Sequence, residues 1–330
     1  MASPSPADGS VARAPVLVIG SANVDVSVRT ATLPRAGETV PGDSCVLSVG
    51  GKGANQAAAA ALLGAPTEFI ARIGTDVFAP MVGAALGERG VSTTGVVALD
   101  GESTGIAAIY VEHSGQNCIV VVPGANGRLS AADVDRIAPL VASAAIVVLQ
   151  CEVPWSANLR AVELARAAGV PVLLNPAPSR GLERASLPAG VHYLVPNETE
   201  AAAISGMPVR DAREAAACAT SLRDDGIGCV IITLGASGCV VADAGGVYAH
   251  PAPRVSVVDT TGAGDAFVGC LAAGLAAGCA RDVAVRRALL YGSLATTRRG
   301  ALVSYASGAE FEQVWAASQR AEAPVGGDAQ

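Results

Sequence analysis

Short apolar runs that alternate with segments of helical periodicity most constrain what this chain can fold into. Five such runs lie at residues 16–20, 145–149, 170–174, 193–195 and 229–234. Helical patterns lie at residues 54–63, 155–168, 199–204 and 211–222. Runs that are apolar throughout are typical of parallel strands buried on both faces. The alternation predicts an α/β protein of three layers, α/β/α, with a mostly parallel central sheet.

Two further regions break this rhythm. Residues 39–49 and 105–122 alternate apolar and polar side chains without a helical period, and HSGQN at 113–117 is typical of a turn between strands. They predict a small antiparallel β lid that projects from the main sheet. Two consecutive helices are expected at 264–277 and 281–297. We expect one domain over residues 15–320, between a disordered tail at 1–14 and a flexible tail at 321–330.

Composition excludes several classes of protein. The net charge is −7 and no basic cluster stands out, which argues against nucleic-acid binding. The longest uncharged run falls short of the roughly 18 residues that a membrane span needs, and the N-terminus lacks the apolar segment of a signal peptide. The eight cysteines form no CxxC pair and the three histidines are scattered, so we expect free thiols in a reducing cytoplasm and no zinc site.

The single lysine of the chain stands in the stretch SVGGKGANQAAAAALLGA, residues 48–65. A preference for arginine, of which there are 21, explains why lysine is rare. It does not explain why Lys52 lies between glycines at the start of an alanine-rich helix.

A second glycine-rich stretch, VVDTTGAGDAFVG at residues 257–269, joins a strand-like run to a helix that begins near Asp265. Backbone N–H groups at such a turn, together with the helix dipole, make a site for an anion. Asp265 is either a stabiliser of the first helical turn or a general base beside a phosphate. The dinucleotide fingerprint GxGxxG and the Walker sequence GxxxxGK[ST] are both absent, which argues against a dehydrogenase and a Walker-type NTPase.

Several short segments occur together in a specific order: GSANVD (20–25), GGKGANQ (50–56), GESTG (101–105), NPAP (175–178), PNETEA (196–201), TLGASG (233–238) and DTTGAGD (259–265). With them, the chain resembles the ribokinase branch of the PfkB carbohydrate kinase family from about residue 16 to about residue 311. The resemblance implies a ribokinase-like fold and the transfer of a phosphoryl group from ATP to a sugar.

The resemblance also implies a set of sugar-binding residues: Asn23, Asp25, Gly51, Lys52, Gly53, Ala54, Asn55, Glu152 and Asp265. In this arrangement Lys52 is a compact positive charge near the reacting phosphates, where a planar guanidinium would not fit between glycines. Two other interpretations stay open from the residues alone. Asn23 and Asp25 are also typical of a loop turn, and Glu152 of a surface loop.

For the nucleotide, the resemblance implies ATP-binding residues Asn197, Thr233, Leu234, Gly235, Ala236, Ser237, Gly238, Gly264 and Asp265, and an anion hole of Gly262, Ala263 and Gly264. Glu200 is expected to hold Mg²⁺ through a water molecule. A K⁺ site is expected from Asp259, Thr261, Ala295, Arg298, Gly300 and Ser304, mostly through backbone carbonyls. Asn197 and Glu200 also fit a capping box at a helix start.

The expected reaction is phosphorylation of D-ribose at O-5 to give D-ribose 5-phosphate and ADP, with Asp265 as the general base. Pairing of the exposed lid strands would make a homodimer. The alternatives are a kinase of the same family for another substrate (deoxyribose, fructose or a nucleoside), a non-catalytic sugar-binding protein and a Rossmann dehydrogenase.

Overall fold

The structure, a computed structural model, describes residues 13–179 and 181–322 of the 330 in the sequence. The tails predicted at 1–14 and 321–330 lie outside the described residues, apart from residues 13–14 and the two residues that end the last helix.

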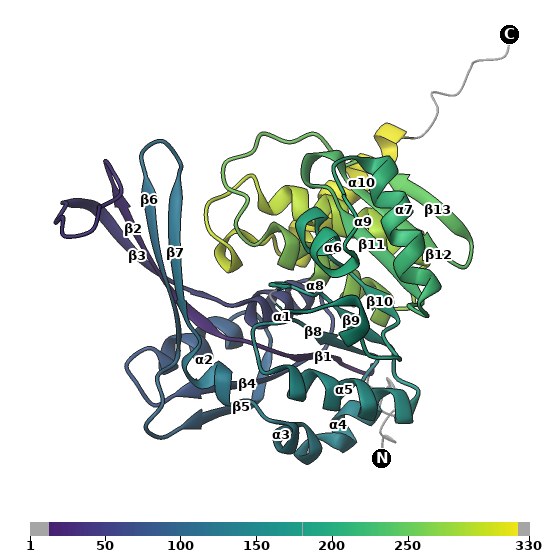
Figure 1. The fold of residues 1–330 in the computed structure, drawn as a ribbon, viewed down its shortest axis with the longest axis horizontal. Helices are drawn as coiled ribbons and strands as arrows, with labels where there is room; N and C mark the ends of the chain where they lie inside the picture. The colour runs from purple at the N-terminus through teal and green to yellow at the C-terminus, as the bar shows by residue number, and fades with distance from the viewer. Residues whose placement is uncertain (1–12, 180, 323–330) are drawn as a thin grey trace, which may run out of the picture.

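A nine-stranded sheet forms the centre of the molecule, in the order β13-β12-β11-β10-β9-β8-β1-β4-β5 (Figure 1). Its strands are β1 (Val16–Ile19), β4 (Thr67–Gly74), β5 (Ser92–Leu99), β8 (Ile146–Leu149), β9 (Val172–Leu174), β10 (Tyr193–Leu194), β11 (Cys229–Thr233), β12 (Cys239–Asp243) and β13 (Gly246–His250). Neighbours pair in parallel from β5 to β11, and β12 and β13 add an antiparallel hairpin at one edge. The predicted parallel sheet is confirmed.

Helices cover both faces of this sheet, as predicted. The helices are α1 (Lys52–Leu62), α2 (Ala79–Gly87), α3 (Ala131–Arg136), α4 (Ala138–Ser143), α5 (Trp155–Ala168), α6 (Glu198–Ser205), α7 (Ala212–Asp224), α8 (Ala263–Ala276), α9 (Arg281–Ala295) and α10 (Gly308–Glu322). Buried side chains of α1, α2, α8, α9 and α10 belong to one hydrophobic core, and those of α3 to α7 to the core on the other face (Figure 1). Short 3-10 helices are η1 (Gly124–Arg128), η2 (Arg184–Ser186), η3 (Gly235–Ser237) and η4 (Leu302–Ser304).

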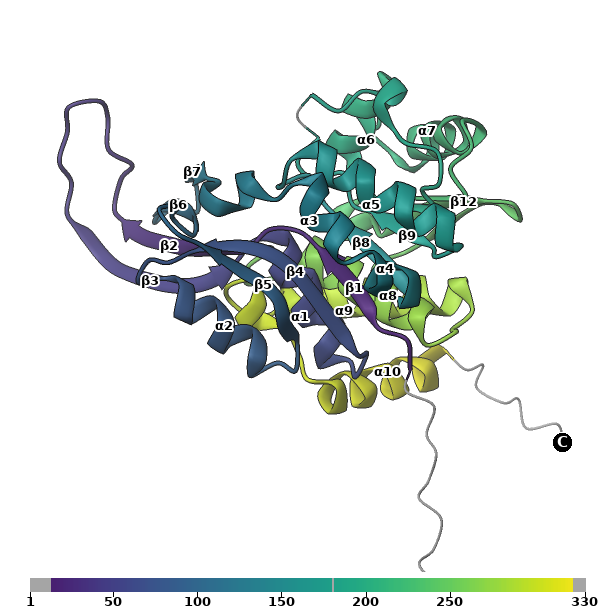
Figure 2. The same cartoon turned by 90° about the horizontal axis from the view of Figure 1, so that it is seen from below.

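A second sheet of four strands projects from the body and forms the predicted lid (Figures 1 and 2). Its order is β3-β2-β6-β7, with β2 (Asn23–Thr30), β3 (Gly42–Gly50), β6 (Gly105–Glu112) and β7 (Asn117–Val122). The outer pairs are antiparallel, whereas β2 and β6 pair in parallel, so the lid is a mixed sheet. The sequence analysis did not predict strand β2, which links the main sheet to the lid.

All eight cysteines are unpaired thiols, as expected. Cys218, Cys229, Cys239 and Cys270 are buried, but Cys45 and Cys118 are exposed on the lid. Among the helices of the described residues, none is both long enough and apolar enough to cross a membrane.

Candidate active site

The loops that follow the parallel strands meet at the C-terminal ends of the strands of the central sheet, where open α/β sheets bind ligands. They contribute to a cavity of about 240 Å³. Seven of the predicted site residues line it: Lys52, Asn197, Glu200, Thr233, Gly262, Gly264 and Asp265. Predicted residues of the sugar and of the nucleotide segments therefore face one shared space.

Asp265 lies in the first turn of α8, but its side chain makes no capping hydrogen bond. It is only 6% exposed, and its carboxylate accepts two hydrogen bonds from α1. Asn55 Nδ2 donates to Oδ2 and Gln56 Nε2 donates to Oδ1, each at 2.9 Å. The carboxylate of Asp265 is therefore held by amide groups of another helix, α1, and does more than stabilise the start of α8.

Gln56 is part of a chain of buried amides that the sequence analysis missed. It also donates to Asn175 Oδ1 at 3.1 Å and accepts from Gln150 Nε2 at 2.7 Å. Asn175 in turn donates to the backbone oxygen of Val195 at 2.8 Å. These bonds fix which way each amide points, and so fix the orientation of Asp265. Gln56 and Asn175 lie inside the segments GGKGANQ and NPAP, so these two segments could have indicated both residues as candidates for the site.

The N-terminus of α1 is joined to the loop after β8 through Glu152. Its Oε2 accepts from the backbone N–H of Lys52 at 2.9 Å and from Ser21 Oγ at 2.6 Å. Glu152 lies in the loop after β8 and is partly buried, which is compatible both with a ligand role and with the alternative of a surface-loop carboxylate. The bonds to Glu152 fix the position where α1 begins and therefore where the side chain of Lys52 starts.

Lys52 stands among acidic groups, and the charge of Asp265 is the main cause that raises its pKa. Glu152 and Glu200 add to this effect, against the opposing effect of burial. Lys52 is therefore a protonated cation in the cavity. The nearby thiol of Cys151 has its pKa raised to about 12 by burial, so it is a neutral and unreactive group.

Asn23 and Asp25 lie in strand β2, so the alternative that they form a loop turn is wrong. Burial, with the charges of Glu152 and Asp265, raises the pKa of Asp25 to about 6. Asn23 Oδ1 accepts from Asn126 Nδ2 at 2.8 Å, a contact that the sequence analysis also missed.

Glycines flank Asn23 at the root of the lid. Asn23 pairs with Gly50 on β3 and with Gly105 on β6, in one row across three strands. A Cβ atom at Gly105 would lie 2.2 Å from Asn23 Oδ1, and one at Gly50 would lie 2.2 Å from Asp25 Oδ2. The row therefore carries a single side chain, that of Asn23, which is 5% exposed.

Asn197 and Glu200 form the capping box that was the alternative to a ligand role. Asn197 Oδ1 accepts from the Glu200 N–H, and Glu200 Oε2 accepts from the Asn197 N–H, both at 2.9 Å. Both residues also line the cavity, so the cap and a ligand role are compatible. Burial is the main cause that raises the pKa of Glu200.

The segment TLGASG is only partly inside the cavity. Thr233 ends β11, forms a bridge to Asn197 and lines the cavity. Leu234 is buried, whereas the η3 turn of residues 235–237 is exposed and Gly238 is buried. The structure therefore places most of the predicted nucleotide loop outside the cavity, on the adjoining surface.

The residues predicted for K⁺ come together beside the anion loop. Asp259 Oδ1 accepts from the N–H and hydroxyl of Thr261, and Oδ2 accepts from the Gly300 N–H at 2.9 Å. Ser304 Oγ donates to the backbone oxygen of Ala301 at 2.7 Å, which leaves its lone pairs for a cation. Across residues 13–179 and 181–322, no group of three or more His, Cys, Asp or Glu side chains is placed to hold a metal ion.

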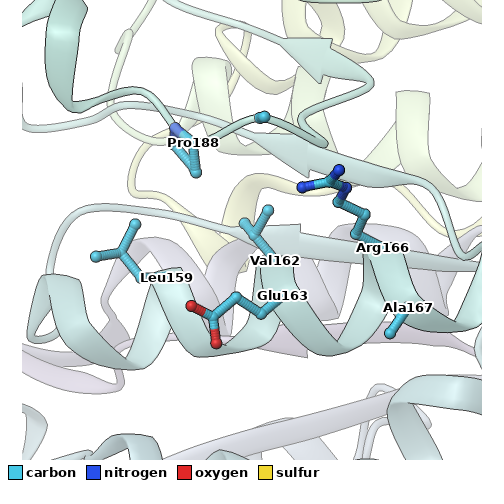
Figure 3. A pocket seen from close by; sticks show the side chains of 7 residues that line it. Leu159, Val162, Glu163, Arg166, Ala167 and Pro188 are labelled. Atoms are coloured by element: carbon cyan, nitrogen blue, oxygen red, sulfur yellow. The ribbon is translucent and has the colours of Figure 1, made fainter.

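A second pocket, of about 360 Å³, lies between α5 and the segment at Pro188–Ala189 (Figure 3). Its lining combines aliphatic side chains with Glu163 and Arg166 of α5. None of the predicted site residues lines it, so it is separate from the site at the C-terminal ends of the strands.

Comparison with known proteins agrees with the arrangement of these segments. The sequence profile of the pfkB family carbohydrate kinases matches residues 13–307. A deoxyribokinase of Salmonella typhimurium is 37% identical over 298 residues, which are 90% of this chain and 97% of the relative. A ribokinase of Mus musculus is 39% identical over 261 residues, or 78% of this chain and 81% of the relative. The structure of Arabidopsis thaliana ribokinase complexed with ribose and ATP superposes with a TM-score of 0.85 at 33% identity, covering 92% of this chain and 98% of that one.

Proposed function

Because the chain belongs to the pfkB family of carbohydrate kinases, we propose that it transfers the γ-phosphoryl group of ATP to O-5 of D-ribose, giving D-ribose 5-phosphate and ADP. One observation carries the proposal: the buried carboxylate of Asp265 shares a cavity with Lys52 and with the first turn of α8. A proton acceptor, a cation and backbone N–H groups are the parts that this transfer requires.

In this mechanism Asp265 accepts the proton of the attacking hydroxyl as its oxygen approaches the γ-phosphorus. General-base catalysis of this kind contributes typically about 10²- to 10⁴-fold. The hydrogen bonds from Asn55 and Gln56 orient the carboxylate before substrate binds, so little reorganisation is needed in the transition state. The protonated Lys52 and the N–H groups at the start of α8 stabilise the negative charge on the transferred group.

The residues present fit a magnesium ion bound with the nucleotide. Mg²⁺ keeps several waters and is held by one or two carboxylates plus phosphates rather than by a protein cage. Glu200 uses Oε2 for the capping box, and no hydrogen bond to its Oε1 occurs within the described residues. Oε1 is therefore the oxygen that would hold a metal-bound water. When bound, the ion would supply positive charge that offsets the negative charge of the phosphates.

The residues at the end of α9 likewise fit K⁺, which prefers hard oxygen ligands. Backbone carbonyls of Thr261, Ala295, Arg298 and Gly300, with oxygens of Asp259 and Ser304, make the proposed donor set. Asp259 already ties two of these segments together through its bond to the Gly300 N–H. We place the ion there as a support for the shape of the anion loop, and activity should rise with K⁺.

A second candidate substrate is 2-deoxy-D-ribose, because a deoxyribokinase is among the relatives at 37% identity. The two candidates are separated by a panel of D-ribose, 2-deoxy-D-ribose, D-fructose and inosine, with ADP release measured in the presence and absence of K⁺. Highest kcat/KM for D-ribose supports the proposal. Preference for another member of the panel overturns the substrate, and no sugar-dependent ADP release overturns the kinase in favour of a sugar-binding protein.

We also propose a homodimer that pairs the lids. Strand β7 is an edge strand, and its apolar residues Ile119, Val120, Val121 and Val122 are 49–55% exposed. Exposed apolar edge strands are prone to pair with another chain, so a second lid is a suitable cover. The free thiols suit a reducing compartment, which supports a cytoplasmic location.

A further inference from the structure

Tyr305 connects the segment after α9 to the first residue of the anion loop. Its hydroxyl donates to the backbone oxygen of Gly262 at 2.9 Å. The same oxygen accepts from the N–H of Ala266 at 2.9 Å, the first hydrogen bond of α8. Both lone pairs of this carbonyl are therefore used, one by the helix that follows and one by Tyr305.

The contact at Gly262 is close as well as polar. Gly262 has φ = 75°, the left-handed conformation that glycine adopts without strain. A Cβ atom placed there would lie 2.7 Å from Ala301 Cβ and 2.9 Å from the hydroxyl oxygen of Tyr305. The segment 301–305 thus packs directly on the backbone of the anion loop, with no room for a side chain between them.

Two hydrogen bonds clamp segment 300–305 against segment 259–262. At one end Asp259 Oδ2 accepts from the Gly300 N–H at 2.9 Å, and at the other end Tyr305 donates to Gly262. The second bond lies nearer to the N–H groups proposed to bind phosphate. Without it, the described residues of the two segments would keep only the hydrogen bond at Asp259.

The hydroxyl of Tyr305 is a permanent donor. Tyr305 is 7% exposed, and burial raises the pKa of its hydroxyl far above the usual value, with a smaller contribution from the charge of Asp265. It therefore keeps its proton at every pH at which the protein would work. The proposed reaction makes no chemical use of this hydroxyl, which leaves the bond to Gly262 as its role.

We propose that Tyr305 is a positioning residue, which fixes the backbone of Gly262 so that the N–H groups of the first turn of α8 are ready for the transferred phosphate. The inference rests on the proposed phosphoryl transfer. It adds a residue that was absent from the predicted site and that lies 43 positions from its partner in the sequence.

The test compares Tyr305→Phe with Tyr291→Phe. Tyr291 is 1% exposed, and its hydroxyl donates to the backbone oxygen of Ala306 at 2.7 Å. Each variant thus loses one buried bond from a tyrosine hydroxyl to a carbonyl, at a similar cost in stability. Only Tyr305→Phe loses the bond to the anion loop, so Tyr291→Phe controls for the loss of stability.

Steady-state kinetics and hydrogen–deuterium exchange are measured on the full chain. For Tyr305→Phe we expect kcat to fall roughly 5- to 30-fold with the KM for sugar within about two-fold, because misplaced groups slow the chemical step. We also expect faster exchange in the peptide that contains Ala266, whose N–H bonds to Gly262. Tyr291→Phe should change neither quantity by more than about two-fold.

Equal losses of kcat in both variants, or unchanged kcat and exchange in Tyr305→Phe, would overturn the inference. The exchange measurement needs no turnover, so it decides whether Tyr305 orders the loop even if the wild-type protein phosphorylates none of the sugars. In that case the substrate panel refutes the proposed function, and the loop result stands separately.

Discussion

The α8 end of the candidate site and the lid are built in opposite ways. At the α8 end, Asp265 and Gln56 are 6% and 0% exposed, and amide hydrogen bonds fix their orientation. In the lid, every residue of β7 is exposed, and the few buried side chains, such as Asn23 and Val24, lie mostly at its root. Regions with few buried contacts open easily, whereas densely packed, buried regions do not. The difference suggests that the groups proposed for chemistry are fixed in advance and that sugar recognition depends on the more mobile sheet.

The largest expected effect tests the fixed end. Asp265→Asn should lower kcat by about 10²- to 10⁴-fold, because an amide cannot accept the hydroxyl proton. Sugar affinity, measured by calorimetry, should change much less. Asp282→Asn, in the first turn of α9, is the matched control for a helix-stabilising aspartate. Equal activity in Asp265→Asn and the wild type would remove the general base from the mechanism.

The next effect concerns the cation at the same end. Lys52→Arg should lower kcat by roughly 10²-fold while the sugar Kd changes only a few-fold, since the guanidinium is planar and larger than an ammonium group. Stopped-assay kinetics and calorimetry separate the two quantities. Full activity of the arginine variant would show that any positive charge suffices at position 52.

At the junction of the two regions, the negative charge of Asp25 should lower the stability of the folded protein. Its pKa in the folded protein is about 6, against an ordinary value of 3.8 for an aspartate, so folding favours the protonated form. The stabilisation from this preference is complete below about pH 4 and is lost as pH rises through 6. Asp25→Asn should therefore increase the free energy of unfolding by about 3 kcal/mol at pH 7.5 and by little at pH 4.

Urea denaturation at the two pH values measures this difference. The same variant should bind sugar at least about 10-fold more weakly, because a carboxylate that accepts hydroxyl bonds is lost. A variant that is less stable than the wild type at pH 7.5 would contradict the assignment of a partly buried carboxylate whose negative charge disfavours folding.

The smallest expected effect on the stability of the monomer is at the exposed edge strand β7. It is also the most direct test of the role proposed for the lid. Val120→Lys on β7 should shift the proposed dimer toward monomer in sedimentation at micromolar concentration, because a charge on an edge strand opposes pairing. The free energy of unfolding should change by less than about 0.5 kcal/mol. Val247→Lys on β13, an edge strand of the central sheet, is the control and should leave association unchanged. Association unaffected by Val120→Lys would place any interface elsewhere.

The sequence predicted the elements whose signal is local. The wholly apolar runs of β1 and β8 and the long helical periods of α5 and α7 were correctly identified. Strand β2, with the sequence NVDVSVRT, was missed because two of its polar residues are the predicted sugar ligands and suggested a loop. The pair α3 and α4 is interrupted at Ile137, which hides a helical period.

The site was predicted through its motifs, and what lay outside them was missed. Lys52 and Asp265 stand in distinctive glycine-rich segments. Gln150, Asn126 and Tyr305 act through partners that lie 94, 103 and 43 positions away in the sequence. No local pattern encodes such contacts, because they exist only after the sheet and its loops bring distant segments together.

The row Gly50–Asn23–Gly105 at the root of the lid limits how this chain could acquire a different acceptor. Both flanking positions already hold the smallest residue, and even one methyl group at either would collide with Asn23 or Asp25. Substitution of either glycine can therefore only narrow the space proposed for the sugar at this point. A relative that accepts a bulkier acceptor must gain its room elsewhere, by shortening side chains that face this row or by tilting the whole sheet.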